Sequence, residues 1–304
     1  GPWGAKSVER LIHTWKPDVL FTLGDPWMVD WAAKIEGRDR VRWVMYVPID
    51  RDPISRAWID VLSRPDCLVL YSDWGAEVVR RQMPYRTPLV IPHGVDTTVF
   101  HPFTPEKRMA ARRMLGIDEH AFVVGQIARN QDRKQVPLTI GAFKAFNCMC
   151  AADEERVAGS ARPLPPNLAY SCPVCGDFEQ DPEKASSMLY LHMTMGDDSD
   201  DGRGVSWNIH ELVRRYDLGG RVLGTPGYTV RKGVASRDLN AIYNLFDVHV
   251  LTTKREGYGL SVIESMASGI PNVVTAYSAC RELVEKGGGE LIDVLAYVNE
   301  PHDE

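Results

Sequence analysis

The 304-residue sequence lacks three features that would each indicate a particular class of protein. No apolar run approaches the roughly 20 residues of a membrane-spanning helix, so we expect no transmembrane segment. Basic residues are not in excess, because 35 Lys and Arg stand against 41 Asp and Glu. Since broad binding to the phosphates of a nucleic acid needs a net basic face, we expect no nucleic-acid partner. No signal peptide is recognisable, and with only six cysteines this favours a reducing, cytoplasmic compartment.

What the sequence contains is an alternation of short apolar runs with helix-length amphipathic stretches. Hydrophobic residues make up 44% of the chain, as in a globular protein with an ordinary core. Near-continuous apolar strands between helices predict an α/β fold with parallel sheets covered on both faces. The predicted strands are 19–23, 41–47, 67–71, 88–91, 122–128, 189–193, 221–224, 248–253 and 272–276, and the clearest predicted helices are 7–15, 76–83, 137–146, 208–216 and 237–246.

Two blocks of this alternation are separated by a polar stretch rich in Pro and Thr, residues 91–108, which predicts a linker. We therefore expect an N-terminal domain over 1–95 and a C-terminal domain over 96–304. Residues 147–186 are rich in Pro, Cys, Asp and Glu and predict an insertion or long loop in the second domain. Two parallel sheets joined in this way turn the carboxyl ends of their strands toward a shared cleft, where ligands bind.

The stretch KREGYGLSVIESMASGIP places Glu256 and Glu264 on either side of a Gly-aromatic-Gly turn. Gly257 and Gly259 allow the backbone to approach a ligand, and the helix that follows offers free N–H groups to a phosphate. A carboxylate at Glu264 can accept hydrogen bonds from the two hydroxyls of a ribose, and Glu256 can bind another hydroxyl-rich group. Phosphates flanked by two such carboxylates describe a nucleotide sugar.

Each of these residues also has a plainer interpretation. Glu264 could form a capping box with Ser261, and Glu256 could be a solvated charge in a turn. A second motif favours the ligand, because Arg129 and Lys134 follow an apolar strand and could hold a pyrophosphate between them. Alone, that motif could be a solvated loop with a cluster of charges. Its presence in the same predicted domain gives both motifs more weight.

With these motifs, residues 91–290 resemble the retaining GT-B glycosyltransferases, in particular the family 4-like group that includes sucrose synthases and bacterial mannosyltransferases. The E-x7-E block LNAIYNLFDVHVLTTKREGYGLSVIESMASGIPNVVT carries most of the resemblance, and IPHGVDTTVFHP, VVGQIARNQDRKQVPLTIGAF and YSDWGAEVV add to it. His93 stands where the family more often has Asn, and Gln135 stands where Gly is usual. The resemblance implies two Rossmann-like domains facing a cleft, with the N-terminal domain truncated.

The resemblance further implies a retaining, metal-independent hexosyltransferase that needs no cofactor and uses a UDP- or GDP-sugar. The acceptor would be a glycan, a lipid or a small molecule. Asp25 and Asp50, at strand ends, are acceptor-side candidates, unless they are loop caps or solvated turn residues. The implied catalytic residues are Glu256, Arg129, Lys134 and Asp50, and the implied donor-binding residues are Arg129, Lys134, Gly257, Tyr258, Gly259, Leu260 and Glu264. The alternatives are a catalytically impaired GT-B-like module that binds nucleotide or carbohydrate, and a GT-B enzyme of another reaction type.

Four cysteines in and before the predicted insertion suggest a structural zinc site. Cys148 and Cys150 form a C-x-C pair, and Cys172 and Cys175 form a C-x2-C pair. Four thiolates are a common ligand set for structural zinc, which could fold a loop that has no core of its own. The alternative is four reduced thiols without a metal.

Overall fold

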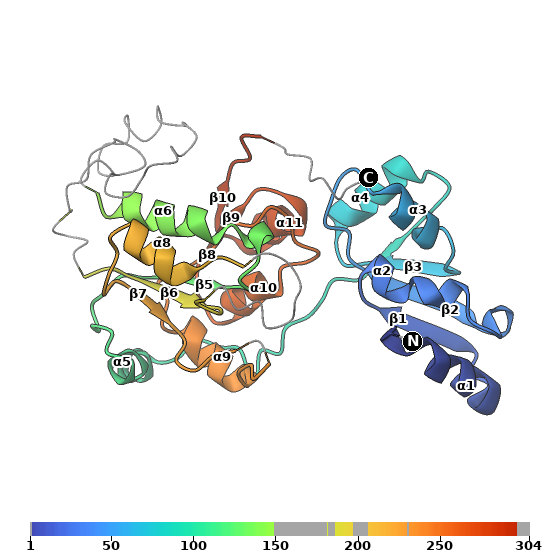
Figure 1. Cartoon of the computed structure of the whole chain (residues 1–304), viewed down its shortest axis with the longest axis horizontal. Coiled ribbons are helices and arrows are strands. Elements are labelled where there is room, and N and C mark those ends of the chain that lie inside the picture. The colour runs from blue at the N-terminus through green and yellow to red at the C-terminus, as the bar shows by residue number, and fades with distance from the viewer. Residues whose placement is uncertain (1, 149–180, 182–185, 197–205, 230, 297–304) are drawn as a thin grey trace.

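The chain folds into two parallel β-sheets, each associated with its own helices (Figure 1). The computed structural model describes residues 2–148, 181, 186–196, 206–229 and 231–296. The first sheet has the strand order β1-β2-β3-β4, and the second has the order β10-β9-β8-β5-β6-β7. The predicted α/β fold with parallel sheets is therefore confirmed. The predicted insertion at 147–186 lies almost entirely outside the described residues.

The first sheet is covered by helices on one face. Its strands are β1 (Val19–Leu23), β2 (Arg42–Val47), β3 (Cys67–Leu70) and β4 (Leu89–Val90), and its helices are α1 (Ala5–Trp15), α2 (Pro26–Val29), α3 (Arg56–Leu62) and α4 (Asp73–Gln82). Alternate side chains of β2, namely Trp43, Met45 and Val47, are fully buried against these helices. The carboxyl ends of the strands remain open to the rest of the molecule.

No described helix covers the opposite face of this sheet, and the two outer strands expose apolar side chains there. Along β1, Val19, Phe21 and Leu23 are between 51% and 59% exposed, and Leu89 on β4 is 56% exposed. The described helices α1 to α4 all pack on the other face, where the buried clusters of this sheet lie. The expectation that both faces of each sheet are covered is therefore wrong for the part of this sheet that the structure describes.

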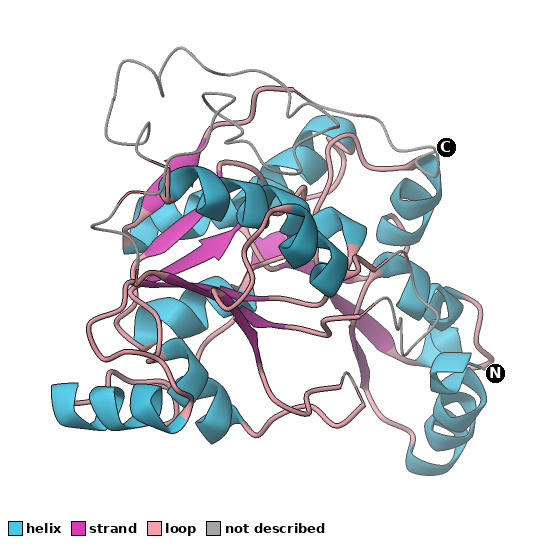
Figure 2. Cartoon of the chain, turned by 60° about the vertical axis from the view of Figure 1, so that its left-hand side comes forward, coloured by secondary structure: helices cyan, strands magenta, loops and turns pink. Residues whose placement is uncertain are grey.

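The second sheet, in contrast, has helices on both faces (Figure 2). The cluster around Phe246 and Tyr243 packs on one face, and the cluster around Phe143 and Leu191 packs on the other. Its strands are β5 (Val123–Ile127), β6 (Met188–His192), β7 (Val222–Gly224), β8 (Val248–Leu251), β9 (Asn272–Thr275) and β10 (Glu290–Ile292). Its helices are α5 (Pro105–Met114), α6 (Val136–Phe146), α8 (Ile209–Arg215), α9 (Ser236–Tyr243), α10 (Leu260–Ala267) and α11 (Ser278–Gly287).

The chain crosses between the sheets over residues 91–104, because α5 begins at Pro105, inside the stretch predicted as linker. Helix α11 packs against α4 of the first sheet. Glu282 on α11 accepts a hydrogen bond from the backbone N–H of Trp74 at 3.0 Å. Lys286 forms an ion pair with Asp73 at 2.8 Å. None of the described helices has the length and apolar character that a membrane crossing requires.

Candidate functional site

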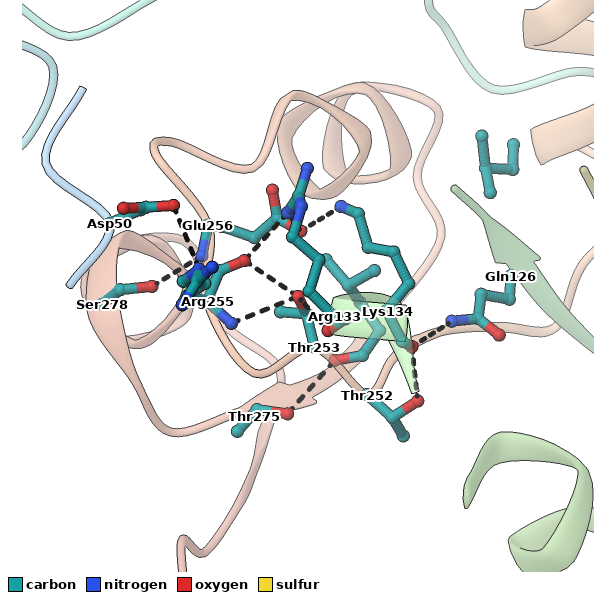
Figure 3. A network of polar contacts seen from close by, with 12 residues as sticks. Asp50, Gln126, Arg133, Lys134, Thr252, Thr253, Arg255, Glu256, Thr275 and Ser278 are labelled. Carbon is teal, nitrogen blue, oxygen red and sulfur yellow. Dashed lines mark hydrogen bonds and ion pairs between the residues drawn. The ribbon is translucent and has the colours of Figure 1, made fainter. Parts of the chain in front are cut away.

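A buried ion pair lies where the loops after β5 and β8 meet (Figure 3). Because β5 and β8 are neighbours in the sheet, the loops at their carboxyl ends adjoin. Lys134 ends the short 3-10 helix η4 (Asp132–Lys134) and donates its Nζ to Glu256 Oε1. Arg133 donates Nη1 to the same oxygen at 3.2 Å. The side chains of Lys134 and Glu256 are 9% and 10% exposed, so Glu256 is not a solvated turn charge.

The two cations keep the Glu256 carboxylate ionised. Burial alone would raise the pKa of Glu256, but the charges of Lys134 and Arg133 outweigh it and lower that pKa. The pKa of Lys134 is lowered, chiefly by burial, although Glu256 opposes that change. In the structure, therefore, Lys134, which was predicted to bind pyrophosphate, forms an ion pair with Glu256, which was predicted to bind the sugar.

Threonines at the end of β8 hold η4 in place. Thr252 donates its hydroxyl to the carbonyl of Lys134 at 3.3 Å, and Thr253 donates to the carbonyl of Arg133 at 3.2 Å. The N–H of Lys254 also donates to the Arg133 carbonyl, at 2.7 Å. These bonds cross-link the two loops, so the ion pair sits on a rigid backbone.

The glycine bend follows Glu256 directly and leads into α10. Gly259 has φ +100 and forms the N-cap of α10 without a side-chain capping bond. A Cβ on Gly257 would lie 2.5 Å from Pro48 of the first sheet, so only glycine allows this approach. The first N–H groups of α10 thus begin beside the ion pair, where the partial positive charge of the helix end favours an anion.

Glu264 lies one turn into α10 and is not a helix cap. Since the helix begins at Leu260 with Gly259 as its cap, the capping box with Ser261 is wrong. Glu264 Oε2 instead accepts a hydrogen bond from the hydroxyl of Tyr243 on α9 at 2.8 Å. Burial raises the pKa of Glu264, and the Tyr243 bond partly offsets that rise.

Arg129 follows the end of β5 and acts on a second group of side chains. It is exposed at the carboxyl end of β5, and its charge acts on Tyr228, whose pKa is raised chiefly by burial. The Tyr228 ring lies 4.4 Å from the ring of His192, at the end of β6. His192 in turn shares a hydrogen bond of 2.7 Å with Thr225, and burial lowers its pKa to about 4. These side chains form a neutral, partly aromatic wall beside an exposed cation.

Acidic side chains of the first sheet face the same region. Asp50 lies 3.5 Å from Nε of Arg255 and 3.6 Å from Nε of Arg51. The pKa of Asp25 is raised by burial and by the charge of Asp50, while Arg133 acts to lower it. Asp25 occupies the N-cap of α2 but makes no side-chain capping bond. Asp25 therefore lies within electrostatic range of Arg133, and Asp50 lies within electrostatic range of Arg255.

Two residues of this site were not predicted from the sequence. Arg133 and Arg255 stand beside Lys134 and Glu256 in the chain, and their only signal was the local excess of positive charge.

A cavity of about 340 Å³ adjoins Glu256, because Ser278 in its wall accepts a hydrogen bond from the Glu256 N–H at 3.1 Å. It is lined by Asp52, Trp74, Ala276, Tyr277, Ser278 and Arg281.

The zinc prediction falls mostly outside the described residues. Cys150, Cys172 and Cys175 belong to the part that is not described, and Cys148 is buried. Within the described part, no group of three or more His, Cys, Asp or Glu side chains could hold a metal ion. The zinc site therefore stays a prediction.

Residues 209–303 match the family model described as glycosyl transferases group 1. Two relatives are 26% identical to this chain. One is the lipopolysaccharide core biosynthesis mannosyltransferase LpsB of Rhizobium meliloti, aligned over 68% of this chain and 46% of its own length. The other is the D-inositol 3-phosphate glycosyltransferase of Stackebrandtia nassauensis, aligned over 76% of this chain and 43% of its own length. The chain thus spans less than half the length of these curated relatives.

Two solved structures share the fold at 18% sequence identity. Sucrose-phosphate synthase from Thermosynechococcus elongatus superposes with a TM-score of 0.68 over 96% of this chain and 64% of its own. Anabaena HepE in complex with UDP-glucose superposes with a TM-score of 0.66 over 96% of this chain and 70% of its own. The predicted GT-B fold and the resemblance to glycosyltransferases are therefore confirmed.

Proposed function

We propose that this chain binds a nucleoside-diphosphate sugar and transfers the sugar to an acceptor, with retention of configuration at the anomeric carbon and without a metal ion. The observation that carries the proposal is the Lys134–Glu256 pair at the glycine bend. This pair places a cation and a carboxylate near the start of α10. The cation and the N–H groups of α10 suit a diphosphate, and the carboxylate suits the hydroxyls of a sugar.

The chemistry follows from where negative charge develops. When the bond between the anomeric carbon and the diphosphate breaks, the electron pair leaves with the phosphate oxygen. Lys134, Arg133 and the N–H groups at the start of α10 would stabilise that charge from fixed positions, which is usually a large part of catalysis. In this proposal the diphosphate takes over part of the interaction that Glu256 makes with Lys134, and Glu256 then accepts hydrogen bonds from the sugar hydroxyls.

The remaining groups divide between the nucleoside and the acceptor. Glu264, held by Tyr243, would accept the ribose hydroxyls. Tyr228 and Thr225 would lie beside the base, with Arg129 near a phosphate. Asp50 would face the acceptor from the first sheet. The similar proteins support this proposal, since they include a mannosyltransferase, a D-inositol 3-phosphate glycosyltransferase and a protein in complex with UDP-glucose.

The test is a thermal-shift panel with UDP-glucose, GDP-mannose and ADP-glucose. A ligand at 100 times its Kd stabilises the folded state by about 2.7 kcal/mol, which is several degrees in Tm for a domain of this size. One nucleotide sugar should give that shift for the wild type and for Glu211→Gln, an exposed glutamate of α8, but not for Glu264→Gln. Absence of any shift with the wild type would refute the proposal. Turnover measured with the same donor separates a transferase from a module that only binds.

A further inference from the structure

Ser278 holds a backbone conformation that serine disfavours. Its φ is +54, in the left-handed region where glycine is favoured. The residue is 1% exposed and stands at the first position of α11. Its hydroxyl accepts a hydrogen bond from the backbone N–H of Glu256 at 3.1 Å. A strained residue that persists next to a candidate site is a reason to look for a functional role.

The same turn of α11 also packs against the glycine bend. Around Gly259, the nearest atoms to an added Cβ are Leu283 Cδ1 at 3.3 Å and Cys280 Sγ at 3.4 Å, both from α11. On the other side of the bend, Gly257 meets Pro48 of the first sheet. The bend is therefore held between α11 and Pro48, and the Ser278 hydroxyl accepts a hydrogen bond from Glu256, the residue before the bend.

We propose that Ser278 is a positioning residue, which fixes the backbone of Glu256 so that its carboxylate meets the sugar of a bound nucleotide sugar. This inference rests on the function proposed above. Glycine would adopt the same φ without strain but would leave the Glu256 N–H without this acceptor. The hydroxyl thus explains why a strained serine, rather than glycine, suits this position. Because the bond acts on Glu256, its loss should affect recognition of the sugar more than recognition of the nucleotide.

The test compares Ser278→Gly and Ser278→Ala with the wild type by titration calorimetry, using UDP-glucose and UDP as a matched pair and GDP-mannose and GDP as a second pair. Asp217→Gly is the control, because Asp217 also has positive φ, at +50, but is exposed in the turn after α8. Both Ser278 variants should bind the nucleotide sugar about fivefold more weakly, while affinity for the nucleotide alone changes by less than twofold. The Tm of Ser278→Gly should stay close to that of the wild type, because relief of strain offsets the loss of the buried hydrogen bond, and the Tm of Asp217→Gly should rise or stay level, because strain alone is relieved there.

Two outcomes would overturn the inference while leaving the proposed function intact. If the wild type binds the sugar nucleotide and Ser278→Gly leaves the ratio of the two affinities unchanged, Ser278 does not position Glu256. If both affinities fall together with the Tm, the residue is only structural. If the wild type binds neither nucleotide sugar, the proposed function fails and the inference fails with it.

Discussion

Replacing Lys134 with methionine should destabilise the protein by about 3 kcal/mol. The Lys134 and Glu256 side chains are 9% and 10% exposed, so the variant would leave a carboxylate in a site with little access to water. Removal of one partner from a buried ion pair costs about 3–5 kcal/mol. We expect the lower end, because Arg133 still faces the same carboxylate at 3.2 Å and is itself 33% exposed. Methionine retains most of the apolar stem of lysine, so the loss of packing is small.

A double-mutant cycle separates the ion pair from other effects of these changes. Glu256→Gln should also destabilise, because it leaves Lys134 buried beside Arg133. In the Lys134→Met, Glu256→Gln double variant, neither residue of the pair is left as an uncompensated charge. The loss of unfolding free energy in the double variant should therefore be about 2 kcal/mol smaller than the sum of the two single losses.

The free energy of unfolding of the wild type, the two single variants and the double variant is measured by urea unfolding at pH 7, followed by circular dichroism at 222 nm. Lys34→Met is the control, because Lys34 and its partner Asp30 are 67% and 42% exposed, and such surface pairs contribute about 0–1 kcal/mol. Additive losses, or a Lys134→Met protein as stable as the wild type, would refute the assignment of a buried, coupled pair.

Three further predictions concern other parts of the structure. Affinity for the nucleotide sugar should fall as the pH falls through the raised pKa of Glu264, because the protonated form accepts fewer hydrogen bonds from ribose; calorimetry with Glu264→Gln, at ligand concentrations high enough to measure its weaker binding, should show a flat profile over the same range. Asp247→Asn should lower the free energy of unfolding in urea by about 2–4 kcal/mol, because two arginines, both bonded to Asp247 at 2.7 Å, lose their charged partner. Burial lowers the pKa of His249 to about 4, so between pH 6.5 and 4 the unfolded chain binds a proton that the folded chain does not. Stability should therefore fall as the pH drops through that window, by up to about 3 kcal/mol from this residue, and urea unfolding of His249→Gln should show a shallower pH dependence.

Most strands could be predicted because a buried strand of a parallel sheet is a short apolar run. All nine predicted strands occur, including β5 and β8, whose adjacency builds the site. The strand β10 (Glu290–Ile292) was not predicted, since three residues give too short a pattern. The uncovered face of the first sheet was not predicted either. An apolar run predicts that both faces of a strand are buried. It does not show which helices, if any, cover each face.

The site could be predicted in its composition but not in its pairing. Residue types after strands correctly brought Lys134, Glu256 and the glycine bend together. The ion pair between Lys134 and Glu256 was not predicted, because it depends on side-chain geometry that residue types alone do not specify. The role of Arg129 at the pyrophosphate stays a prediction, and the contact of Arg133 with Glu256 was not predicted from the sequence. The role of Ser278 depends on a backbone angle, which no residue pattern specifies.

A crystal structure with the nucleotide sugar that gives the largest thermal shift would test the central idea most directly. We predict the diphosphate between the Arg133–Lys134 pair and the first N–H groups of α10, with Glu256 on the sugar and Glu264 on the ribose. A nucleotide bound elsewhere, with the Lys134–Glu256 bond unchanged and no phosphate at the glycine bend, would contradict the account.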